Sequence, residues 1–125
     1  MKHPRYNDPL PPAYEGVERQ LMALFYSGVY ITNADIVKVG KSLGLQLPLK
    51  ERTALLKQIM QHAYDNDMKP AMLQAFIQLL QERIKSYQTL AQAFPTAAPL
   101  IQTWIQKARS TAMLLQREMR SNPYE

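Results

Sequence analysis

The second half of the chain carries a repeat of apolar side chains whose spacing fits only a long helix. From Leu73 to Phe94, apolar residues follow alternating steps of four and three, which places them on one helical face. The members of this stripe are Leu73, Ile77, Leu80, Ile84, Tyr87, Ala91 and Phe94. Pro95 ends the pattern, and a second stripe runs from Ile101 to Met119. Because only a short connection separates the two stripes, the sequence predicts an antiparallel helical hairpin.

Three shorter helices are predicted ahead of this hairpin. The first spans residues 13–26, where apolar positions recur at helical spacing. Asn33 is suited to cap a second helix, and Gly44 is suited to follow its end. Pro48 fits the first turn of a third helix, which ends at the turn signal beginning with Asp65. We therefore predict an all-α fold, a small four- to five-helix bundle built on a long C-terminal antiparallel helical hairpin.

The length of 125 residues is typical of a single domain. Apolar residues make up 46% of the chain and charged residues 20%, which is the composition of a globular protein. We expect residues 1–12 to form an irregular, proline-rich N-terminal arm, residues 13–121 a single helical domain and residues 122–125 a short tail.

The residues that most enzymes and metalloproteins need are scarce in this chain. It has no cysteine, which excludes disulfides, thiolate catalysis and cysteine-ligated metals. His62 and Asp65 are too few to complete a metal site, and no glycine-rich phosphate loop or nucleophile motif occurs. We therefore expect no catalytic residue, no metal and no small-molecule cofactor. No apolar run is long enough to span a bilayer, and no apolar stretch follows Lys2 and Arg5, so we expect a cytoplasmic protein without a membrane partner.

A basic stripe lies on the last predicted helix, opposite its apolar face. Arg109, Met113, Arg117 and Arg120 recur at helical spacing there. The chain has a net charge of +5, so an anionic partner is permitted. Cations near a helix C-terminus are favoured by the helix dipole, and a solvated face explains the stripe equally well. A methionine among arginines also suits an acidic protein surface or a phosphate backbone.

The first long helix of the hairpin has a wider apolar face than two packed helices require. Met72, Phe76, Leu79 and Leu90 widen its apolar stripe to about 160° of the helix, whereas a helix with one covering layer needs about 100°. Met72, Leu79 and Leu90 form the flank of this stripe. The three shorter helices can cover part of this flank. A second copy of the chain or a partner helix can cover the rest, so we predict a homodimer or a hetero-complex.

Two local features have alternative interpretations. Arg52 falls inside the apolar stripe of the third predicted helix and must reach water or a partner. Residues 11–14 match the Pro-Pro-x-Tyr pattern that WW domains read, but the same residues also suit the start of a helix.

The sequence as a whole favours a binding protein. We predict a non-catalytic protein-binding module, such as a small adaptor, a chaperone-like protein or an accessory subunit, that uses helix faces to contact another protein or its own copy. The alternative is a non-specific nucleic-acid-binding subunit that uses the basic stripe.

Overall fold

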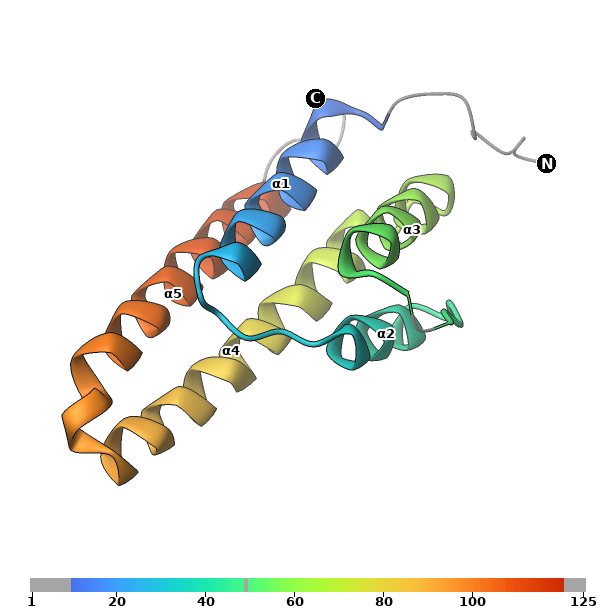
Figure 1. The fold of residues 1–125 in the computed structure, drawn as a ribbon. Coiled ribbons are helices and arrows are strands. Elements are labelled where there is room, and N and C mark those ends of the chain that lie inside the picture. The colour runs from blue at the N-terminus through green and yellow to red at the C-terminus, as the bar shows by residue number, and fades with distance from the viewer. Residues whose placement is uncertain (1–9, 49, 121–125) are drawn as a thin grey trace.

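The computed structural model describes residues 10–48 and 50–120, and helices account for nearly all regular structure in this part of the chain (Figure 1). The elements are α1 (Pro12–Tyr26), α2 (Asn33–Ser42), α3 (Arg52–Asp65), α4 (Lys69–Ala93), a 3-10 helix η1 (Pro95–Ala97) and α5 (Ala98–Arg120). No strand occurs within these residues. The predicted all-α fold with a long C-terminal hairpin is confirmed.

Helices α4 and α5 pack against each other along their length as an antiparallel hairpin (Figure 1). Leu80 of α4 and Ile105 of α5 are almost completely shielded from solvent in this interface. The connection is tight because Pro95 cannot continue α4 and begins η1 instead. The heptad positions of α4 and α5 therefore hold these two helices together as the long hairpin on which the other helices pack.

Helices α1, α2 and α3 form a second layer on one side of the hairpin. Helix α1 packs against α5 and α3, whereas α2 and α3 pack against α4 (Figure 1). The shared core contains fully buried side chains from every helix of both layers, among them Leu21, Ile36, Leu56 and Phe76. The turn end of the hairpin projects beyond this layer, so the first half of α4 is covered and its second half is more open (Figure 1).

The ends of α2 differ slightly from the prediction. Thr32, and not Asn33, is the N-cap: its hydroxyl accepts the Asp35 N–H at 3.0 Å, and its own N–H donates to the Asp35 carboxylate at 2.9 Å. This reciprocal pair satisfies two helix-end groups, which the Asn33 side chain alone cannot do. Gly44 follows the C-cap residue Leu43 with φ of +80°, as predicted.

Helix α3 begins at Arg52, and the expectation that Pro48 lies in its first turn is wrong. Residues 45–48 form an extended connection in which Leu47 packs onto Gly40 of α2. Because the residues before Pro48 pack against α2 as part of the α2–α3 connection, helix α3 starts only after this connection ends. Leu49, residues 1–9 of the expected arm and the tail at 122–125 lie outside the described residues, and Pro12 already belongs to α1.

Arg52 finds its partners within the protein. Its guanidinium donates to the carbonyl of Ile31 at 3.2 Å and lies 5.6 Å from the centre of the Phe25 ring. A cation held between a carbonyl and an aromatic face needs no partner-facing groove.

The Pro-Pro-x-Tyr motif lies at the start of a helix. Pro12 is the first residue of α1, and Tyr14 is buried with its ring 5.4 Å from that of Tyr64. A WW domain reads an extended, exposed segment, so this helical conformation does not present the motif for such recognition.

Candidate functional site

Helices α4 and α5 alone line a groove of about 680 Å³, which we call the hairpin groove. Its floor is apolar and consists of Ile84, Ala112 and Met113. Met113 has 55% of its surface exposed. The groove therefore offers a partner an apolar surface that the fold itself leaves uncovered.

Polar and charged side chains form the rim of the hairpin groove. Glutamines from both helices contribute most of it, with Lys85 on α4 and Arg109 on α5 as its cations and Glu82 as its carboxylate. Both cations are exposed, and neither forms an ion pair with another described residue. Two cations against one carboxylate leave the rim with a net positive charge.

The structure places the predicted basic stripe on an exposed face of α5. Arg109 and Met113 line the hairpin groove, whereas Arg117 and Arg120 lie beyond it in the last turns of the helix. All four side chains are exposed. Glu118 of the same helix forms an ion pair with Lys69 of α4.

The predicted apolar flank on α4 does not form one accessible surface. Met72 is fully buried and Leu79 is 8% exposed, whereas Leu90 is 38% exposed. The N-terminal layer covers the first half of the helix: Leu79, for example, lies beside Val39 of α2. Met72 and Leu79 are therefore core residues, and the wide apolar arc requires no second copy along this part of α4.

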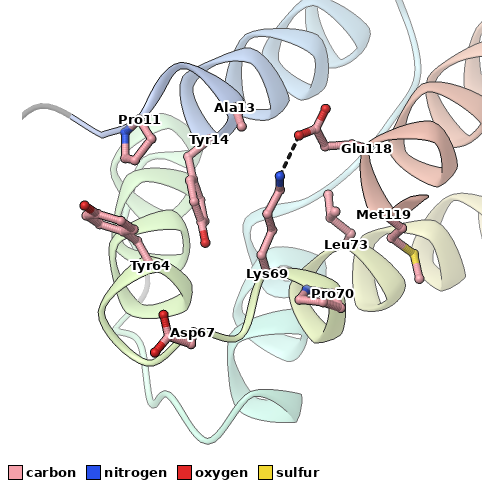
Figure 2. A pocket seen from close by; sticks show the side chains of 10 residues that line it. All are labelled: Pro11, Ala13, Tyr14, Tyr64, Asp67, Lys69, Pro70, Leu73, Glu118 and Met119. Carbon is pink, nitrogen blue, oxygen red and sulfur yellow. Dashed lines mark hydrogen bonds and ion pairs between the residues drawn. The ribbon is translucent and has the colours of Figure 1, made fainter. Parts of the chain in front are cut away.

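A smaller cavity of about 370 Å³ lies where α1, the α3–α4 turn and the end of α5 meet (Figure 2). Lys69 donates to the Glu118 carboxylate at 2.6 Å and lies 5.9 Å from the centre of the Tyr14 ring. Tyr14 packs in turn on Tyr64. Because the lysine bridges α4 to both α5 and α1, we interpret this cluster as the junction that closes the open end of the hairpin.

Sequence reasoning missed part of the hairpin groove. Lys85 and Ile84 were not singled out as site residues, because their position opposite Arg109 and Met113 depends on the register between α4 and α5. No local pattern encodes that register. Lys85 follows Glu82 by three residues and comes directly after Ile84 of the apolar stripe. This position is the only signal in the sequence for this edge of the groove.

The remaining titratable groups of the described chain differ in their spacing and in their partners. No group of three His, Asp or Glu residues there can hold a metal ion. His62 has its Nε2 atom 3.1 Å from the Leu43 carbonyl oxygen and its Nδ1 atom 3.3 Å from the Asn66 amide nitrogen. Burial raises the pKa of Glu18 on α1, and Lys57 partly opposes this shift.

Two further observations bear on the class of protein. No helix in residues 10–48 or 50–120 is both long and apolar enough to cross a bilayer. Comparison with protein-family models, with curated proteins and with solved structures finds no match to this chain.

Proposed function

We propose that this protein is a non-catalytic protein-binding module whose hairpin groove holds an acidic amphipathic helix of another protein. The observation that carries the proposal is the combination of an exposed apolar floor around Met113 with a cationic rim at Lys85 and Arg109. Amphipathic helices dock in grooves of this kind through apolar side chains spaced three and four residues apart. A helix lying along α4 and α5 would extend the hairpin as a third member of a bundle.

The charge of the rim supports a partner other than a second copy. A symmetric dimer uses the same patch on both subunits, so Arg109 and Lys85 of each subunit would approach the cations of the other. Like charges brought together in this way oppose association. Glutamates flanking the apolar stripe of a partner helix would instead meet the two cations.

Nucleic acid is the second candidate partner. Arg109, Arg117 and Arg120 are exposed on one helix and form no ion pair with another described residue, so they can contact phosphates. The apolar floor favours the protein partner, because Ile84 and Met113 gain nothing from a phosphate backbone. The two candidates differ in salt dependence: phosphate contacts weaken log-linearly with salt, whereas apolar contacts respond modestly.

Quantitative affinity capture from the protein's own cells tests the proposal. The full chain and the variants Arg109→Glu, Met113→Glu and Arg19→Glu would be compared after nuclease treatment. Arg19 is an exposed residue of α1, so its replacement is the charge-matched control. We expect a protein with an acidic amphipathic helix to be captured by the native chain and the control but lost by both groove variants. Identical capture by all four proteins, or capture that nuclease abolishes, would contradict the proposal.

A further inference from the structure

Two segments without any charged residue meet beside the second half of α4. Residues 20–34 and residues 86–106 contain no Asp, Glu, Lys, Arg or His. The Tyr30 N–H donates to the Tyr87 hydroxyl at 2.7 Å, which joins the α1–α2 connection to the second half of α4. We call the hairpin turn together with this neighbouring α1–α2 connection the turn pole, and neither of the two segments that form it carries a charged residue.

The turn pole also concentrates the exposed large apolar side chains. Leu90, Phe94 and Leu100 lie around the hairpin turn, Tyr26 is the last residue of α1, and Tyr30 lies on the α1–α2 connection. Phe94 is 60% exposed and Leu100 is 56% exposed. The other exposed large apolar side chains of the described chain, Met113 and Leu114, lie further along α5. Apolar exposure of this kind marks an interaction surface.

The side chains of the turn pole are ordered along the hairpin axis. Phe94 and Leu100 flank the turn, and lysines are the first charged residues behind them on both helices. At 1.5 Å per residue, Lys85 lies about 14 Å behind Phe94, and Lys107 about 10 Å behind Leu100. Lys107 donates to the Ser27 carbonyl at 3.0 Å, which places the connection carrying the exposed tyrosines at the level of the lysine.

The backbone of the turn suits surroundings that contain little water. The Phe94 N–H bonds to the Leu90 carbonyl at 2.9 Å, and the Ala97 N–H bonds to the Phe94 carbonyl at 3.0 Å. Pro95 has no N–H to satisfy, and neither does Pro99. A polar backbone group without a partner is costly in a lipid environment, and this turn satisfies or removes most of its donors.

We propose that the turn pole docks on an anionic phospholipid bilayer, with Phe94 and Leu100 in the acyl region and Lys85 and Lys107 at the phosphates. Apolar side chains at the tip, with tyrosines and lysines together at a level behind them, match the successive layers of a bilayer surface. The hairpin turn is about two helix widths across, or a few hundred Å², which is small beside the roughly 800 Å² that each partner buries in a standard protein interface.

Vesicle flotation of the full chain tests this proposal. The vesicles would be phosphatidylcholine alone and phosphatidylcholine with phosphatidylglycerol. We expect the native protein to float with the anionic vesicles with a partition coefficient on the order of 10⁴ M⁻¹, similar to that of a single acyl anchor. Phe94→Glu and Leu100→Glu should each reduce this binding at least tenfold. Replacing Lys85 and Lys107 together with glutamine should lower binding to the anionic vesicles only.

Leu114→Glu is the matched control, because Leu114 is 40% exposed on the same hairpin but lies outside both the turn pole and the hairpin groove. We expect it to bind vesicles like the native chain, with circular dichroism confirming that every variant is folded. Three results would overturn the proposal: no flotation of the native protein at about 1 mM lipid, equal losses in Phe94→Glu and Leu114→Glu, or concentration-dependent self-association that Phe94→Glu abolishes without any vesicle binding. The last result would identify the turn pole as a protein interface instead.

Discussion

Replacing Leu80 and, separately, Leu100 with alanine removes the same atoms from two different environments of the hairpin. Leu80 of α4 is fully buried, whereas Leu100 is 56% exposed at the turn pole. Removing a buried leucine side chain costs about 2–5 kcal/mol, because apolar contacts are lost and a cavity remains. The exposed leucine leaves no cavity, so its removal should change stability by about 0.5 kcal/mol or less.

Urea unfolding followed by far-ultraviolet circular dichroism measures both effects. Leucine and alanine have similar helix propensities, so helix formation itself contributes little to the difference. Ile105→Ala should behave like Leu80→Ala, because Ile105 is 1% exposed on the facing helix. Equal costs for Leu80→Ala and Leu100→Ala would refute the division of the hairpin into a covered half and a bare turn end. A native-like Leu80→Ala would show that α4 buries another face.

Four further substitutions test local features of the fold by the same unfolding assay. Gly28→Ala should cost about 2 kcal/mol or more of stability, because φ at this residue is +110° and a Cβ atom would lie 2.7 Å from the indole of Trp104. Gly16→Ala should instead stabilise the protein by about 0.5–1 kcal/mol, because Gly16 lies within α1 and a Cβ atom there would meet open space. Asp35→Ala should cost about 1–2 kcal/mol, because this carboxylate caps α2 and accepts from a guanidinium of α4 at 2.8 Å. Burial raises the pKa of Glu18 above its ordinary value of 4.5, so the stability that this group contributes is full below pH 4.5 and is lost as pH rises through the folded pKa. Glu18→Gln should therefore flatten stability across that pH range, and an unchanged pH profile would contradict the assignment.

The parts of the fold that sequence reasoning predicted are those encoded by local spacing. The repeat from Leu73 to Phe94 and the stop at Pro95 specify the hairpin within one continuous segment. The start of α3 was misplaced because the signal at Pro48 competes with packing of Leu47 on α2, a contact between different elements. Long-range partners such as Lys69 and Glu118 leave no periodic trace in the sequence.

The candidate sites likewise contain residues that local spacing predicts and residues whose placement depends on tertiary packing. The stripe containing Arg109 and Met113 could be predicted, because residues four apart share a helical face. The burial of Met72 and Leu79 could not, since it depends on where the N-terminal layer docks along α4. The charge-free segment at 86–106 was visible in the sequence, but its meeting with residues 20–34 depends on the tertiary fold.

Methionine methyl resonances test most directly whether the hairpin groove is a helix-binding site. Met113 is exposed on the groove floor, whereas Met60 and Met72 are fully buried. The full chain with ¹³C-methyl methionine would be titrated with a designed amphipathic helix that carries leucines at positions i, i+3 and i+7 and glutamates beside them. A dissociation constant of about 1 mM, or about −4 kcal/mol, suffices for detection. We expect the Met113 signal to shift progressively while the Met60 and Met72 signals remain in place. A Met113 signal that does not move at millimolar peptide would contradict the proposed function.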